Sequence, residues 1–212
     1  MIKNRKQIRI GRQTISYTHI QTGSPKICFM LSGSGYNYDK PLFYYSNMMM
    51  LQNSIDVVHV HYSYDDTFSK KSMDEITEIM MEDVNPVILE VLSNVFYKDV
   101  IFLGKSIGTI PIANDLMKRA EFLNSTMILL TPLLNFEDIF NSIRLSPHHG
   151  LLVLGDQDTH FNPSFLPKLN STNLNIEIIP NANHSLDIEA SNTMDSVVAL
   201  SKVMQRIQEV IT

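Results

Sequence analysis

Gly104-Lys105-Ser106-Ile107-Gly108 is the stretch that decides the fold of this chain. The apolar run 100–103 leads into it, and the helix-compatible stretch 109–119 leads out of it. A strand, a sharp turn and a helix in this order form the setting of a G-x-S-x-G nucleophile elbow. Glycines are needed because a Cβ at either flanking position would clash where the strained turn brings backbone segments together. The stretch predicts a serine nucleophile, Ser106, on a strand-to-helix turn.

Short strand-like runs alternate with longer helix-like stretches on both sides of this turn. Strands are predicted at 26–31, 56–62, 99–103, 126–130, 150–154 and 175–179, and helices at 42–51, 73–96, from about 107 to 119, 136–143 and 193–211. Gln7 to Ile10 and Thr14 to His19 flank Gly11-Arg12 and predict an antiparallel hairpin. The alternation predicts a three-layer α/β/α sandwich around a mostly parallel sheet, with this hairpin at one edge.

Composition and charge narrow the class of protein. A chain of 212 residues without an internal repeat or a long linker predicts a single domain, 1–212. The net charge of −5 argues against a nucleic-acid partner, and the one basic cluster is interpreted as a solvated hairpin: Lys3, Arg5, Lys6, Arg9 and Arg12. The single cysteine, Cys28, lies in an apolar run and is expected in the core. Without a secretory signal or a run long enough to span a bilayer, the expected location is the cytoplasm.

A catalytic Ser106 needs a base, because a serine hydroxyl is a poor nucleophile at neutral pH. The usual base is a histidine oriented by a buried carboxylate, on loops past the carboxyl ends of parallel strands. One such loop carries Asp156, Asp158 and His160, and the next carries His184. Either aspartate is a candidate acid. His184 is favoured over His160 as the base, because an acid and a base on one short loop would have difficulty reaching the serine.

With these residues in place, the chain resembles the α/β-hydrolase superfamily over nearly its whole length. The elbow serine of the family falls on Ser106, its acid, usually the Asp of a Gly-x-x-Asp turn, on Asp158, and its histidine on His184. The resemblance therefore implies a Ser–His–Asp catalytic triad. In this interpretation Asp156 is a turn or capping residue.

The resemblance also indicates where an oxyanion would bind. The oxyanion loop of the family has a His-Gly-x-Gly-like sequence after an early strand, and this chain has Ser32-Gly33-Ser34-Gly35 there. Serine thus replaces the usual histidine, while the backbone donors are retained. By resemblance, the amides of Ser34 and Ile107 hold the oxyanion, and the amide of Ile107 gains from its place at a helix N-terminus.

The substrate is indicated less directly. Aromatic residues follow the oxyanion loop, and three are candidates for an acyl pocket: Tyr36, Tyr38 and Phe43. Only 134–149 separates the strand after the elbow helix from the strand that carries the acid, which is too short for a large cap domain. We expect a serine hydrolase that cleaves small carboxylic esters or thioesters through an acyl-enzyme on Ser106. The alternatives are an amidase or peptidase with the same triad and a non-catalytic ligand-binding module on the same fold.

Two further features have ordinary explanations. His59 and His61 lie two apart on a predicted strand and face the same way, as a metal pair would. No third ligand follows at a helpful spacing, so strand histidines without a metal are favoured, and neither a metal nor a cofactor is expected. Lys105, next to the serine, is interpreted as an exposed elbow side chain.

Overall fold

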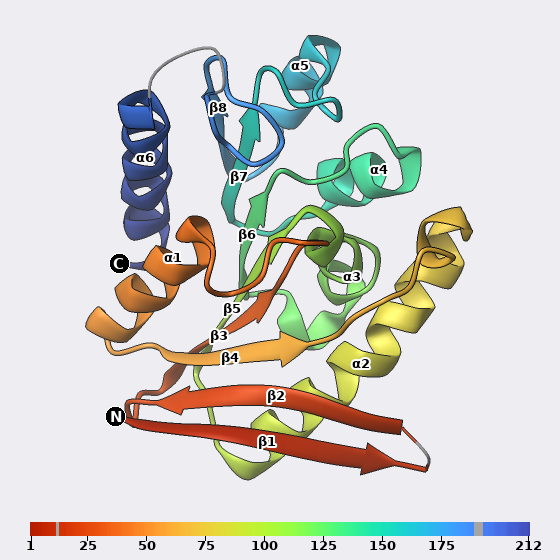
Figure 1. Ribbon diagram of the computed structural model, residues 1–212, viewed down its shortest axis with the longest axis vertical. Helices are drawn as coiled ribbons and strands as arrows, with labels where there is room; N and C mark the ends of the chain where they lie inside the picture. Colours follow the sequence, from red (N-terminus) through yellow and green to blue (C-terminus); the bar gives the residue numbers. More distant parts are fainter. Residues whose placement is uncertain (12, 189–192) are drawn as a thin grey trace.

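One twisted sheet organises the molecule (Figure 1). Over the described residues, 1–11, 13–188 and 193–212, a computed structural model shows eight strands in the order β1-β2-β4-β3-β5-β6-β7-β8. Their bounds are β1 Ile2–Ile10, β2 Gln13–Gln21, β3 Lys26–Leu31, β4 Asp56–His61, β5 Asp99–Lys105, β6 Thr126–Leu130, β7 Gly150–Gly155 and β8 Leu174–Ile179. β1 and β2 are antiparallel, β2 runs antiparallel to β4, and the remaining pairs are parallel. The predicted sheet and hairpin are confirmed; the hairpin is longer than predicted, and Arg12 lies outside the described residues.

Helices cover both faces of the sheet. The α-helices are α1 Pro41–Gln52, α2 Met73–Asn94, α3 Thr109–Asn114, α4 Glu137–Leu145, α5 Leu166–Leu169 and α6 Thr193–Ile211. Short 3₁₀ turns are η1 Phe68–Lys70, η2 Ser106–Gly108, η3 Leu116–Lys118, η4 Ala120–Phe122 and η5 Pro163–Phe165. α1 and α6 pack on one face, and α2, α3 and α4 pack on the other, as Figure 1 shows. The predicted three-layer sandwich is therefore confirmed.

The alternation of side chains along the central strands builds two separate cores. In β3, Phe29 and Leu31 point to the core under α2, α3 and α4, while Cys28 and Met30 point to the core under α1 and α6. All four side chains are fully buried. A strand buried on both faces has a nearly continuous apolar sequence, which is why these strands could be predicted closely.

Two helices differ from their predictions. α2 begins with a capping box between Ser72 and Glu75 and continues through Pro86, ending two residues before the predicted end. The predicted helix after the elbow, which was to run to residue 119, is instead α3, six residues long, followed by η3. The backbone of Asp115 leaves the helical region there, and its carboxylate binds Arg119.

The segment between β6 and β7 holds α4 and no cap domain, so the ends of the central strands are left uncovered by an inserted lid. None of the described helices combines the length and the apolar character needed to cross a membrane.

Candidate active site

The elbow holds Ser106 in a strained conformation directly after β5. Its φ of 53° lies in the left-handed region, which costs a residue with a side chain about 1–3 kcal/mol, and active sites are among the places where such strain gathers. The flanking glycines make this turn fit. A Cβ on Gly108 would lie 2.1 Å from the carbonyl oxygen of Leu31, and one on Gly104 would lie 2.5 Å from that of Gly108. The elbow therefore packs backbone against backbone at the end of β3.

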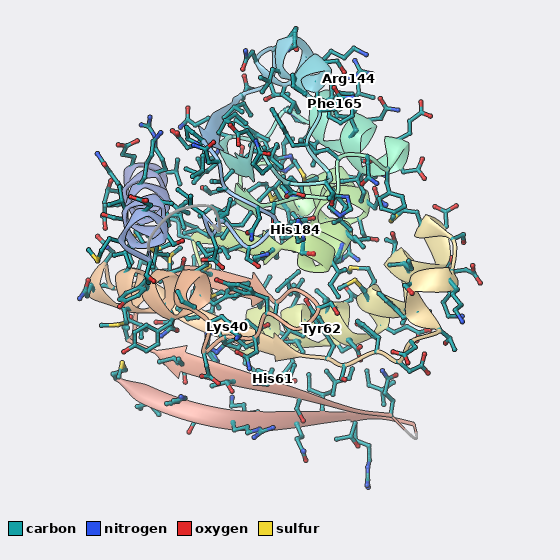
Figure 2. All side chains as sticks on the ribbon, turned by 45° about the horizontal axis from the view of Figure 1, so that its top comes forward. Lys40, His61, Tyr62, Arg144, Phe165 and His184 are labelled. Atoms are coloured by element: carbon teal, nitrogen blue, oxygen red, sulfur yellow. The ribbon has the colours of Figure 1, made fainter. Side chains whose placement is uncertain are left out.

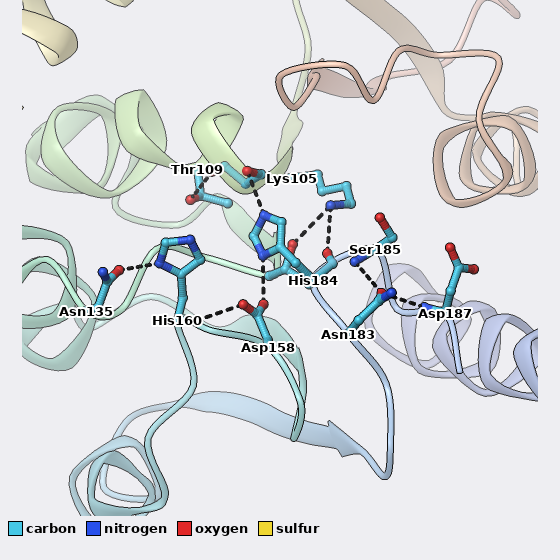
Figure 3. Close-up of polar contacts among 11 residues, drawn as sticks. Lys105, Thr109, Asn135, Asp158, His160, Asn183, His184, Ser185 and Asp187 are labelled. Carbon is cyan, nitrogen blue, oxygen red and sulfur yellow. Dashed lines mark hydrogen bonds and ion pairs between the residues drawn. The ribbon is translucent and has the colours of Figure 1, made fainter. Parts of the chain in front are cut away.

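Three side chains from three loops meet at this elbow (Figure 3). Ser106 Oγ lies 2.9 Å from His184 Nε2, and His184 Nδ1 lies 2.8 Å from Asp158 Oδ2. The loop after β8 is shaped by the side chain of Asn183, whose Oδ1 accepts hydrogen bonds from the amides of Ser185 and Asp187. The structure thus brings together the three residues that the sequence pointed to, in the relative order that proton transfer from serine requires.

Asp158 is suited to hold a histidine ring in one orientation. Its side chain is fully buried, with one oxygen on His184 and the other accepting from the amide of His160 at 2.9 Å. Burial by itself raises the pKa of Asp158, but the hydrogen bonds from His184 and from the His160 amide outweigh this and hold the pKa below its usual value. The carboxylate is therefore ionised at neutral pH.

The two rival residues lie elsewhere. The carboxylate of Asp156 accepts from the amide of Asn181 at 2.7 Å, so it joins the turn after β7 to the turn after β8. The ring of His160 binds the side-chain oxygen of Asn135, and its centre is 5.1 Å from that of His184. Neither residue has a hydrogen bond to Ser106. Asp156 has the turn role that the sequence suggested for it.

The residues named for the oxyanion flank the serine. Gly33 passes so close that a Cβ on it would lie 3.3 Å from Ser106 Cβ. Gly33 to Tyr36 form a tight turn, closed by the Tyr36 amide on the Gly33 carbonyl, with Ser34 at its tip. Ile107 follows the serine within the 3₁₀ turn η2, Ser106–Gly108. Both Ser34 and Ile107 line the same pocket beside the elbow.

Lys105 differs most from its prediction, because its side chain is buried rather than exposed. Only 1% of the residue is accessible. Its ammonium donates to the backbone carbonyl of His184 at 3.0 Å and to Thr131 Oγ1 at 3.2 Å, and it lies 4.6 Å from the centre of the Tyr36 ring. Burial lowers the pKa of Lys105 to about 8, although Asp158 and Asp187 partly oppose the shift. Sequence offered no sign of this, since the carbonyl partner comes from a loop far along the chain.

The three aromatic residues suggested for an acyl pocket do not line one together. Phe43 is fully buried in the core under α1 and α6, so its prediction as a pocket residue is wrong. The hydroxyl of Tyr38 donates hydrogen bonds to two backbone carbonyls, those of Met30 and Val60. Tyr36 lies against Lys105, and its hydroxyl accepts from the amide of Leu42.

A pocket that the sequence did not reveal lies on another side of the elbow. It has a volume of about 460 Å³ and is enclosed by the turn 33–35, the segment after β4, α2 and α3, and the segment after β6. Its aromatic lining includes Tyr62, Tyr64, Phe68 and Phe136. Figure 2 shows Tyr62 and His184 in the central part of the view, between α6 and α2. We call this space the elbow pocket.

The two strand histidines have different surroundings. His59 stacks on Tyr38 with ring centres 4.2 Å apart, and burial lowers its pKa to about 3. His61 Nε2 lies 2.8 Å from Thr18 Oγ1. Among the described residues, the one grouping with metal-ligand spacing is Asp158, His160 and His184, whose ligand atoms lie within 4.8 Å of one another. The hydrogen bonds of the site already account for that closeness.

We compared the sequence and the fold of the chain with those of known proteins. No protein-family model matches the chain, and no curated protein matches it in sequence. Solved structures do match. Dienelactone hydrolase from Anabaena variabilis has a TM-score of 0.72 at 16% identity, covering 99% of this chain and 96% of its own. Est1E from Butyrivibrio proteoclasticus with bound ferulic acid has 0.69 at 11% identity, covering 97% and 99%. A serine hydrolase without a lid from Xanthomonas campestris has 0.66 at 14%, covering 96% and 94%.

The chain therefore has the α/β-hydrolase fold, as the resemblance of its motifs implied. At these identities the likeness establishes the fold alone, because one fold carries many activities. What the protein does has to be argued from its own site.

Proposed function

We propose that the protein is a serine hydrolase that cleaves small carboxylic esters or thioesters through an acyl-enzyme on Ser106. The observation that carries the proposal is the chain of contacts from Ser106 Oγ to His184 Nε2 and from His184 Nδ1 to Asp158 Oδ2, at 2.9 and 2.8 Å. A buried, ionised carboxylate keeps the proton of the imidazole on Nδ1. Nε2 is then free to accept the serine proton.

The first half of the reaction acylates the serine. His184 Nε2 takes the proton of Ser106 Oγ while Oγ attacks the carbonyl carbon, and the carbonyl electron pair moves to oxygen. The amides of Ser34 and Ile107 stabilise this oxyanion. When the intermediate collapses, the bond to the leaving alcohol or thiol breaks, and that group takes the proton from His184. A water molecule then attacks the acyl-enzyme in the same way, with His184 as the base, and the acid is released from Ser106.

The same triad would also serve amide cleavage, and a binding module could retain it. Hydrolases among the structural relatives and the uncovered strand ends favour a small ester or thioester. A lipase of the interfacially activated type is disfavoured, because the segment between β6 and β7 holds only α4 and is too short for a large lid.

A labelling experiment tests the proposal directly. A fluorophosphonate should modify one residue, and peptide mapping should place the label on Ser106. Ser106→Ala should lose both the label and the turnover of p-nitrophenyl acetate, while Ser34→Ala, which keeps its backbone amide, should retain the label. Folding of each variant is checked by circular dichroism. Labelling of another serine, or no turnover of any ester, thioester or amide by folded wild-type protein, would overturn the proposal.

A further inference from the structure

We infer that the elbow pocket binds the acyl group of the substrate and that this group carries an aromatic ring. The inference rests on the proposed ester or thioester hydrolysis and names the substrate class for it. It follows from three features: the place of the pocket relative to the reacting atoms, its size and the rings in its wall.

The place of the pocket assigns it to the acyl side. Its lining includes Ser34 and Ile107, whose amides are proposed to hold the carbonyl oxygen. The leaving group must lie near His184 Nε2, because it takes its proton from that atom. None of the described residues that line the pocket belongs to the loop of Asp158 or to the loop of His184. A group that enters the pocket therefore extends from the carbonyl carbon away from the leaving group.

The pocket has room for a ring. A cavity of roughly 150 Å³ already holds a benzene molecule. The elbow pocket, at about 460 Å³, takes a phenyl ring joined to the carbonyl by one or two carbons, with space for water at its mouth. Its floor is apolar, since Ile76 and Ile110 are both buried there.

The wall is a row of nearly parallel rings. Tyr62 and Tyr64 have ring centres 5.4 Å apart at 18°, and Tyr64 and Phe68 have centres 4.2 Å apart at 7°. Polar contacts fix the row, since the Tyr62 hydroxyl donates to the Ser32 carbonyl at 2.6 Å and the Tyr64 hydroxyl donates to Asp83 at 2.9 Å. The half-exposed ring of Phe136 contributes to the lining from the segment after β6.

Such a wall discriminates between acyl groups of equal carbon number. An aryl group gains ring contacts beyond its buried area, which amount to about two- to tenfold in binding for each ring pair. It also has few rotatable bonds to immobilise, whereas a straight alkyl chain has many. The elbow pocket should thus prefer an aryl acyl group over an alkyl one.

Three substrates of similar size separate the alternatives. We expect kcat/KM for methyl 3-phenylpropanoate to exceed that for methyl nonanoate, which has the same number of acyl carbons, by at least about fivefold. It should also exceed that for 3-phenylpropyl acetate, in which the ring is on the alcohol. A higher kcat/KM for methyl nonanoate would overturn the proposal that the acyl group is aromatic. A higher kcat/KM for 3-phenylpropyl acetate would overturn the proposal that the pocket binds the acyl group.

Variants locate the effect in the pocket. Phe136→Ala should lower the ratio of kcat/KM for methyl 3-phenylpropanoate to that for p-nitrophenyl acetate by about five- to tenfold. Phe68→Leu, which keeps an apolar side chain, should lower it in the same direction. Phe96→Ala is the matched control, since Phe96 is 87% exposed and is not among the residues that line the elbow pocket.

The failures of the two proposals are distinguishable. An unchanged ratio in folded Phe136→Ala and Phe68→Leu would overturn the pocket, while p-nitrophenyl acetate was still hydrolysed through Ser106. Loss of all turnover in folded wild-type protein would instead overturn the serine-hydrolase proposal, and the pocket assignment with it.

Discussion

Replacing Lys105 by methionine should remove a contribution to stability that increases with pH above neutrality. The lysine is 1% exposed and its pKa is lowered from 10.5 to about 8, mainly by burial. In the unfolded chain the ammonium keeps its proton up to the higher value. Between the two values the unfolded state therefore binds more protons than the folded state, and the free energy of unfolding increases as pH rises.

The two pKa values set the size of the effect. From pH 7 to 9.5 the wild-type chain should gain about 2 kcal/mol of unfolding free energy through Lys105. Lys105→Met should lack this gain. Buried tyrosines and Cys28 are common to both proteins, so their titration cancels in the difference between the two curves. Any change of packing that methionine causes is independent of pH and shifts the variant's curve without changing its slope.

Urea unfolding followed by far-ultraviolet circular dichroism at several values of pH measures this difference, since the chain has no tryptophan. Lys98→Met, at an exposed lysine, is the control and should keep the wild-type slope. A difference between wild type and Lys105→Met that stays constant from pH 7 to 9.5 would refute the reasoning. It would mean that the ammonium is not buried as described.

Two further outcomes are expected. Asp158→Asn should lower kcat for p-nitrophenyl acetate by about 10⁴-fold, and Asp156→Asn by less than about tenfold; the reverse ranking, measured at matched folding, would move the acid to Asp156. Gly108→Ala should lose about 3 kcal/mol or more of unfolding free energy, because its Cβ would meet the Leu31 carbonyl at 2.1 Å, whereas Gly23→Ala meets no atom within 4 Å; thermal unfolding that ranks Gly23→Ala as the worse would contradict this.

The sequence predicted the structure best where the same physical constraint, such as burial of a strand on both faces, determines both the residue types and the fold. The parallel strands are buried on both faces, so Lys26–Leu31 and Thr126–Leu130 could be predicted to the residue. The elbow was predictable because only glycine fits where Gly104 and Gly108 approach backbone. The fold class followed from these two signals.

Sequence failed where a residue's surroundings come from distant segments. A lysine is almost never fully buried without a partner, so Lys105 was expected at the surface, and its partner is a carbonyl 79 residues away. Phe43 shares its helical stretch with exposed tyrosines, and only the packing of α6 on α1 shows which side is core. The elbow pocket joins the segment after β4 to the segment after β6, and no periodic pattern links these two.

The lysine next to the nucleophile completes a ring of covalent and hydrogen-bond connections between the elbow and the histidine loop. Ser106 is joined by one peptide bond to Lys105, whose ammonium holds the carbonyl of His184, whose ring returns to Ser106 Oγ. β8, which precedes the histidine loop, is the edge strand of the sheet. We expect these contacts to keep the imidazole next to the serine when the edge strand moves. The distance that the proton crosses, from Ser106 Oγ to His184 Nε2, should then depend little on the position of β8.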